Sequence, residues 1–212
     1  MQRIDQQQGG MNREEFRAAL SLSSVYALRM LGLFMILPVF ALYATDLEGV
    51  TPSLTGLAIG IYGLTQAVLQ IPAGLLSDRI GRKPVIVGGL LVFALGSVVA
   101  ALADSMLVVI LGRALQGAGA IAAAIMALAA DLTREQHRIK AMALIGMSIG
   151  LSFALALVLG PVLNDWVGVP GIFAITAVLA LGGILVVLLV VPHPVVSRPH
   201  RVAEAIPAQF GR

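Results

Sequence analysis

Hydrophobic positions in this chain form six long, continuous runs that are separated by short polar segments. A bilayer core of about 30 Å needs roughly 20 apolar residues in a helix, and each run reaches about that length. The runs show no alternation of apolar and polar residues, so we expect helices rather than strands. The predicted membrane helices cover residues 18–44, 53–76, 84–103, 106–130, 139–163 and 170–191. The predicted fold class is an all-α membrane bundle of six transmembrane helices.

The composition agrees with a chain that uses the bilayer as its solvent. Of 212 residues, 58% are hydrophobic and only 12% are charged, which is too apolar for a water-soluble domain of this size. We expect the polar residues 1–17 to form a cytoplasmic N-terminal tail and residues 193–212, with their Pro, His and Arg, to form a cytoplasmic linker. The chain has no cysteine, which excludes disulfides and thiolate metal sites.

Basic and acidic residues alternate from one turn to the next. Twelve of the 14 Lys and Arg lie before the first run, in the turns after the second and fourth runs, or after the sixth. The other turns carry acids, namely Asp46, Glu48, Asp104 and Asp165. By the positive-inside rule, this pattern predicts a multi-pass membrane protein with both termini in the cytoplasm. It also explains the net charge of +3 without nucleic acid as a partner.

The turn between the second and third predicted helices concentrates charge. It contains two glycines and four charged side chains: Gly74, Asp78, Arg79, Gly81, Arg82 and Lys83. Glycines let the two helix ends approach each other, and Asp78 can form charge-assisted hydrogen bonds with its cationic neighbours. These residues are candidates for a gate, although an ordinary positive-inside turn would be basic as well.

Arg113 lies inside the fourth apolar run, three residues before Gln116. A charge at that depth costs at least about 2.5 kcal/mol, so Arg113 should face a cavity or a partner rather than lipid. The alternative is an arginine that snorkels to the surface, because Arg113 lies only about 10 Å from the outer end of the predicted helix.

Arg29 lies near the middle of the first predicted helix, three residues after Tyr26. Gln66 and Gln70 share one face of the second helix and pass through a similar depth, where either amide can accept a hydrogen bond from Arg29. We predict that these four residues form a polar cluster that faces a cavity. A purely structural bond between two helices is the alternative.

The fifth predicted helix contains Gly160-Pro161, a pair that kinks membrane helices, although close helix packing explains the glycine equally well. No Asp or Glu lies deep inside any of the six runs, so a carboxylate for proton coupling is not visible. The histidines, His137, His193 and His200, all lie in polar flanks, and no nucleophile, phosphate-loop or metal-binding motif is present. We therefore expect no enzyme, no cofactor and no metal site.

The pattern G-x-L-x-D-R-x-G-R-K at residues 74–83 resembles the signature loop of major facilitator superfamily transporters. The pattern R-x-x-Q-G-x-G at residues 113–119 resembles the fourth helix of the same superfamily. The resemblance extends over residues 18–192 and favours the drug-efflux branch. Similar spacings of glycine and aspartate after the second and fifth helices favour two inverted three-helix repeats, as in many transporters.

The resemblance implies roles for individual residues. Asp78 would contact a helix N-terminus of an opposite bundle, and Arg82 would pair with Asp131 to close the cytoplasmic side. Arg113 would be associated with substrate or proton coupling. Of the glycine series that antiporters carry in their fifth helix, only Gly160-Pro161 is present here.

Members of this superfamily have twelve helices, so the resemblance implies an N-terminal half from which the second bundle is absent. The expected function is proton-linked efflux of small amphipathic molecules. The expected partners are membrane lipid, a small-molecule substrate, protons and a second six-helix half. The alternative is a truncated product or a non-transporting membrane interaction protein, which would dimerise through the Gly56/Gly60 and Gly146/Gly150 helix faces.

Overall fold

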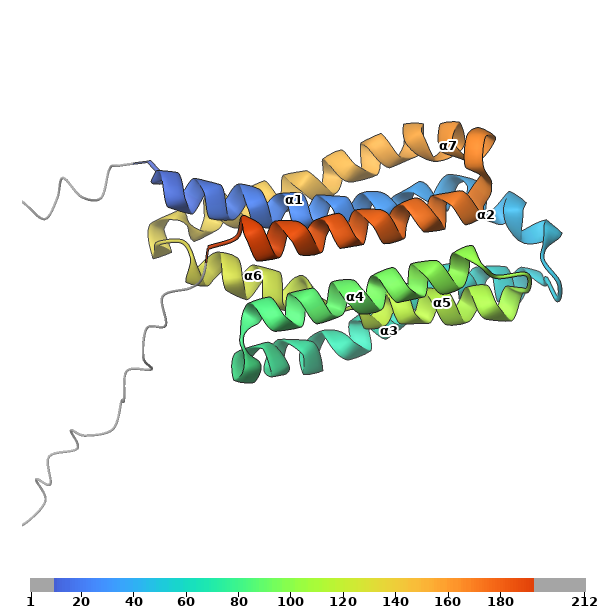
Figure 1. Cartoon of the computed structure of the whole chain (residues 1–212), viewed down its shortest axis with the longest axis horizontal. Coiled ribbons are helices and arrows are strands. Elements are labelled where there is room, and N and C mark those ends of the chain that lie inside the picture. Colours follow the sequence, from blue (N-terminus) through green and yellow to red (C-terminus); the bar gives the residue numbers. More distant parts are fainter. Residues whose placement is uncertain (1–9, 193–212) are drawn as a thin grey trace, which may run out of the picture.

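The computed structural model describes residues 10–192, and every named element in that range is a helix (Figure 1). The first nine residues and the predicted linker 193–212 lie outside the described residues. In chain order the elements are α1 (Arg13–Met35), α2 (Leu37–Tyr43), η2 (Ala44–Asp46), α3 (Pro52–Ile80), α4 (Arg82–Ala101), α5 (Met106–Ala118), α6 (Ala122–Asp131), η3 (Glu135–His137) and α7 (Arg138–Leu189).

The described residues provide six helical spans, because the last of five long apolar segments is divided in two. Five helical segments are long and apolar enough to span a bilayer, and the last of them contains the 52-residue helix α7. At about 1.5 Å per residue, α7 is more than twice as long as a bilayer core is thick. Gly168 interrupts α7 with φ 68° and ψ 177°, and the helix reverses its direction there (Figure 1). The predicted all-α membrane fold is confirmed.

The helices run side by side, so that all turns gather at two ends (Figure 1). At one end, which we call the basic end, lie the start of α1, the α3–α4 turn and the α6–α7 turn. At the other, which we call the acidic end, lie the η2 loop, the α4–α5 turn and the reversal at Gly168. Helix α1 packs against α7, while α5 packs against both α3 and α4.

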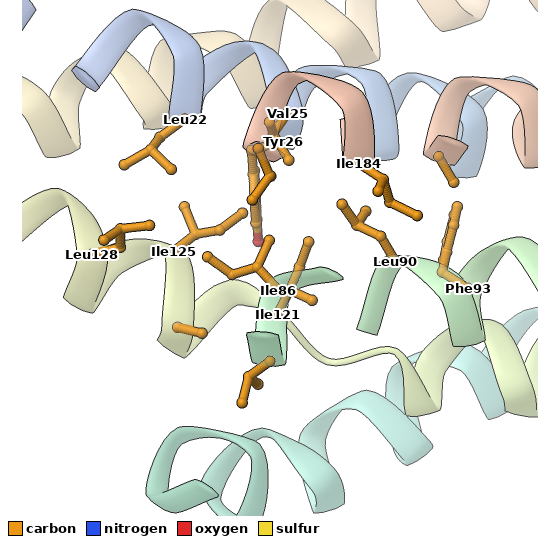
Figure 2. Packing of buried hydrophobic residues seen from close by; sticks show 14 of the residues in the cluster. Leu22, Val25, Tyr26, Ile86, Leu90, Phe93, Ile121, Ile125, Leu128 and Ile184 are labelled. Atoms are coloured by element: carbon orange, nitrogen blue, oxygen red, sulfur yellow. The ribbon is translucent and has the colours of Figure 1, made fainter. Parts of the chain in front are cut away.

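Two apolar clusters fill the space between the helices. Figure 2 shows the larger one, in which Leu22 and Val25 of α1 face Ile86 and Leu90 of α4 and Ile125 of α6. The second cluster lies toward the acidic end and includes Phe40, Met106 and Phe173. Because lipid tails are as apolar as these side chains, helix association in a membrane depends on close packing rather than on the hydrophobic effect.

Glycines bring α5 unusually close to its neighbours. A Cβ atom placed on Gly112 would lie 2.8 Å from the Gly96 carbonyl oxygen of α4. A Cβ on Gly117 would overlap the Tyr62 carbonyl oxygen of α3. Both contacts involve backbone atoms, so α5 can hold these positions only because its contact residues lack side chains.

The structure departs from the predicted boundaries at several helix ends. Helix α3 continues to Ile80 instead of ending at 76, so Gly74, Asp78 and Arg79 of the predicted turn lie on α3 and only Gly81 lies between α3 and α4. The predicted helix 18–44 is divided at Ile36 into α1 and α2. Helix α1 begins at Arg13 instead of 18, because the Asn12 side chain caps it and Glu15 completes a capping box. The predicted helix 106–130 is broken into α5 and α6, with Gly119–Ile121 between them. The fifth crossing continues to Gly168, beyond the predicted end at 163.

Gly160-Pro161, the predicted kink, lies inside α7, and the kink itself stays a prediction. The backbone stays helical through both residues, and Gly168 is the non-helical residue inside α7. A Cβ atom on Gly160 would overlap the Met35 carbonyl oxygen at the end of α1. Gly160 therefore serves close packing of α7 on α1, which was the alternative interpretation.

Candidate functional site

The α3–α4 turn carries an ionic network that joins three helices. Arg82 Nε lies 3.3 Å from Asp131 Oδ2 at the end of α6. Its Nη1 donates to Asp78 Oδ1 and, at 2.8 Å, to Ser77 Oγ of α3. We call these four residues the basic-turn network. The Arg82–Asp131 contact expected from the resemblance is therefore present, while its role in gating stays a prediction.

Glycines and a lysine shape the rest of this turn. Gly81 has φ +100°, a conformation that other residues rarely adopt, and it separates α3 from α4. A Cβ atom on Gly74 would lie 3.3 Å from Ala123 Cβ, so this part of α3 lies close to α6. Lys83 Nζ donates to the Val191 carbonyl oxygen just after α7. Arg79 is exposed and forms no ion pair within residues 10–192.

A third ion pair at the basic end, outside the basic-turn network, was not predicted. Arg134 Nε lies 2.9 Å from Glu15 Oε1, and Arg134 Nη2 lies 3.0 Å from Glu15 Oε2. Glu15 sits in the first turn of α1, ahead of the apolar run that begins at residue 18. The hydrogen bond from the Arg134 side chain lowers the pKa of the Glu15 carboxyl from 4.5 to about 2. The spacing Asn12-x-x-Glu15, a capping box, was the sequence signal for this residue.

Arg113 is buried inside the bundle, where its side chain is only 2% exposed. Its Nε donates to the Ala58 carbonyl oxygen of α3 at 3.2 Å, and its Nη1 donates to Gln116 Oε1 at 2.9 Å. Gln116 Nε2 in turn donates to Ser97 Oγ of α4 at 2.7 Å. The Tyr62 ring covers the guanidinium at 5.1 Å. Arg113 therefore does not snorkel to the surface but ties α3, α5 and α4 together.

Arg29 is also buried, with 1% of its surface exposed. Its Nη2 lies 3.1 Å from Gln66 Oε1 of α3 and 3.1 Å from the Gly119 carbonyl oxygen, at the break between α5 and α6. The Tyr62 and Phe93 rings lie 5.7 and 5.1 Å from its guanidinium carbon. No partner lies within hydrogen-bonding distance of its Nε or Nη1 among the described residues.

The predicted polar cluster is therefore only partly assembled, and it faces the bundle interior. Arg29 contacts Gln66 as expected, but Gln70 Oε1 has no hydrogen-bond partner among the described residues. Tyr26 is 5% exposed and points into the apolar core (Figure 2). The Arg29 guanidinium lies among α3, α4 and the break between α5 and α6, and a role of the cluster in a transport pathway stays a prediction.

A shallow groove of about 340 Å³ lies elsewhere, between α1 and the first part of α7. Its walls are apolar except for serine hydroxyls, and the Ser23 hydroxyl is buried without a hydrogen-bond partner among the described residues. The groove is lined by Leu20, Ser23, Ser24, Ala27, Leu144, Met147, Ser148 and Leu151. Sequence reasoning missed it, because serines that bond to their own helix leave no clear pattern.

Six spanning segments that carry an ionic turn between the second and third are the architecture of one bundle of a secondary membrane transporter. The sequence matches the profile of the Major Facilitator Superfamily over residues 22–210. The chain belongs to this superfamily and corresponds to the N-terminal half of such a transporter. The superfamily consists of transport proteins rather than enzymes. Within residues 10–192, no group of three or more His, Cys, Asp or Glu is placed to hold a metal ion.

Similar proteins agree with this assignment. The chain is 56% identical over 202 residues to the inner membrane transport protein YajR of Escherichia coli. The alignment covers 95% of this chain and 44% of that protein. It is 39% identical over 100 residues to the multidrug resistance protein MdtH of Aeromonas salmonicida, which covers 47% of this chain and 25% of that protein. The chain spans about half the length, or less, of these relatives.

Solved structures share the fold. The human organic anion transporter MFSD10 aligns with a TM-score of 0.70 and 22% identity over 85% of this chain and 48% of that one. A bacterial homologue of the lysosomal transporter Spinster aligns with a TM-score of 0.69 and 19% identity over 87% of this chain and 46% of that one. At these identities the likeness concerns the fold alone.

Proposed function

We propose that this chain forms one wall of a proton-linked efflux carrier for small amphipathic molecules in the bacterial inner membrane, with both termini in the cytoplasm. The observation that carries the proposal is the basic-turn network, in which Arg82 joins Asp78 and Asp131 across the end of the bundle. In this proposal the network closes the cytoplasmic end of the pathway in one state and opens in another.

The exposure of the network fits a contact that is made and broken. The Asp78 and Asp131 side chains are 56% and 45% exposed, whereas Arg82 is 21% exposed. Exposed ion pairs at a membrane surface are worth little individually, so a modest change in their surroundings can separate them. Asp78 faces outward and remains available to the N-terminus of a helix in a second bundle, where the helix dipole favours an anion.

The surface of α3 supports a second six-helix half as the partner. Only 11% of the most apolar stretch of α3 is buried within the bundle. A Cβ atom placed on Gly56, Gly60 or Gly63 would have no neighbour within 4 Å among the described residues. Gly146 and Gly150 of α7 are equally uncovered. Small residues that contact nothing within their own bundle are suited to close packing against another. A second copy of this chain would use the same faces, which is the alternative of a self-associating interaction protein.

Two features bear on the transported molecule and the coupling ion. The groove between α1 and α7 combines apolar walls with serine hydroxyls, a lining that suits an amphipathic molecule. The similarity to a multidrug resistance protein points in the same direction. No carboxylate lies deep inside the predicted spans, so in this proposal the second half supplies the group that exchanges protons.

The proposal is tested by Asp78→Asn and Arg82→Ala in the two-half transporter, reconstituted into liposomes. We expect both variants to insert normally and to lose most of the proton flux driven by a panel of cationic, neutral and anionic fluorescent amphiphiles. Lys140→Ala removes a basic-end cation outside the network and should retain flux. Wild-type flux in both network variants would exclude the gate.

Two simpler measurements separate the alternatives. A reading frame for six further spans after the Arg212 codon supports the transporter, whereas a stop codon without a partner gene supports the self-associating protein. The chain has no cysteine, so single cysteines introduced at positions 77–83 report their side of the membrane without background. Labelling by an impermeant reagent only from the periplasm would overturn the proposed orientation.

A further inference from the structure

The bundle interior holds two positive charges without a carboxylate beside either of them. Twelve of the 14 basic residues lie in the flanks and turns, and the other two are Arg29 and Arg113. The three ion pairs within residues 10–192 all lie at the basic end. A buried cation without a counter-charge is costly in a medium of low dielectric, so the bundle interior favours an anion.

The two arginines differ in what they leave free. Arg113 uses Nε and Nη1 for neutral acceptors within the bundle. Within residues 10–192, Arg29 uses only Nη2, which leaves Nε and Nη1 without acceptors there, and the neighbouring Tyr62 hydroxyl is buried without a partner in the same part of the chain. An anion at Arg29 would therefore find donors that the described chain does not occupy.

The backbone at the same place carries partial charges of both signs. Arg29 donates to the Gly119 carbonyl at the C-terminal end of α5, where the negative end of the helix dipole offsets part of the guanidinium charge. Helix α6 begins three residues later at Ala122 without a side-chain cap, and the first N–H groups of a helix carry positive partial charge. Discontinuous membrane helices commonly place such ends at binding sites in transporters.

Gln66 lies between Arg29 and the uncovered side of α3. Its amide oxygen holds Arg29 Nη2, while its side chain is only half-buried on α3, the least covered of the long helices. Gln66 is therefore the acceptor with which an incoming anion would compete for Arg29.

We propose that Arg29, the Tyr62 hydroxyl and the start of α6 form a binding site for a small anion, and that the amphipathic molecules carried by this transporter include organic carboxylates. The second part of this proposal rests on the proposed function; the binding site itself does not. The aromatic rings of Tyr62 and Phe93 offer the apolar surface that the body of such a molecule needs.

The test is equilibrium binding to the purified full chain in detergent, followed by thermal unfolding. The probes are benzoate, benzamide and benzylammonium, which share a ring and differ in charge, together with chloride as an inorganic anion. We expect saturable stabilisation by benzoate and none by the neutral or cationic analogue. Stabilisation by chloride alone would also support the anion site but would assign it to a halide rather than to an organic acid.

Variants then locate the site. Arg29→Gln should weaken benzoate binding about tenfold or more, since it removes hydrogen bonds to a charged ligand. Gln66→Ala should strengthen binding because it removes the competing acceptor, and Lys140→Gln should leave binding unchanged. If Arg29→Gln does not fold, Arg29→Lys serves in its place, because it keeps the charge and removes the planar fork.

Two results would overturn the site: equal stabilisation by all three ring compounds, or unchanged benzoate binding in a folded Arg29 variant. Binding at equilibrium does not require transport. A chain that binds benzoate but shows no flux would therefore retain the anion site while the proposed function fails. Flux without any preference for anions would support the proposed function and contradict the anion site.

Discussion

The surroundings of Arg113 and Arg29 show two ways in which a membrane bundle can hold a buried cation. Arg113 belongs to a closed chain of donors and acceptors that runs through Gln116 to Ser97 and on to the Phe93 carbonyl. Arg29 holds a backbone carbonyl at a helix break and keeps two nitrogens without acceptors. The closed arrangement joins helices, whereas the open one has capacity for a ligand.

This difference reverses what the motifs alone would indicate. Arg113 stands in the recognisable fourth-helix pattern, yet its contacts within the described chain are those of a structural residue. Arg29 stands in no motif and is the arginine whose contacts are incomplete. Three substitution experiments test this difference between the two arginines, and each measures the thermal stability of the purified chain in detergent.

The largest effect is expected from Gly117→Ala, next to the closed network. The new methyl group would overlap the Tyr62 carbonyl oxygen, which is a backbone atom and cannot rotate away. Overpacking costs typically about 1–3 kcal/mol, and separation of α3 from α5 would also break the Arg113 bond to Ala58. Gly63→Ala, on the open face of α3, is the matched control and should be nearly neutral. A stable Gly117→Ala protein would show that α3 and α5 are not in close contact.

A smaller difference in stability is expected between Gln116→Leu and Gln66→Leu. Each substitution removes the glutamine that accepts a hydrogen bond from one of the two buried arginines. Gln116→Leu leaves Arg113 Nη1 without its acceptor in a fully buried site, at a cost of about 1–3 kcal/mol. Gln66→Leu should cost less, about 0.5–1.5 kcal/mol, because Arg29 Nη2 keeps the Gly119 carbonyl. Equal losses would mean that the two sites do not differ as described.

The smallest effect on stability is expected from Glu15→Gln. This variant is a reference, because Glu15 is a carboxylate that does pair with an arginine, Arg134. The Glu15 pKa is lowered from 4.5 to about 2, so its contribution to stability is present above about pH 4.5 and is lost as the pH falls toward 2. The difference in melting temperature between wild type and Glu15→Gln should therefore be constant near neutral pH and disappear in acid. A difference that grows on acidification would contradict the ion pair.

Hydropathy predicted the crossings because each span must be apolar over its full length, and this requirement leaves a strong pattern. The pairing of Arg29 with Gln66 followed from their similar depth. The break at Gly119–Ile121 escaped prediction, since Gly and Ala continue an apolar run whether or not the helix continues. The direction in which Arg29 points was also out of reach, because it depends on how α1 is rotated against helices distant in the sequence.

Lys83 gives the basic end one more property. By holding the Val191 carbonyl, it ties the residues just after α7 to the α3–α4 turn. Each residue that unwinds from a helix gains nearly 2 Å of reach, from about 1.5 Å to about 3.3 Å. If a second half follows as proposed, release of Lys83 during a rearrangement of the turn would let the end of α7 unwind and would lengthen the connection between the halves.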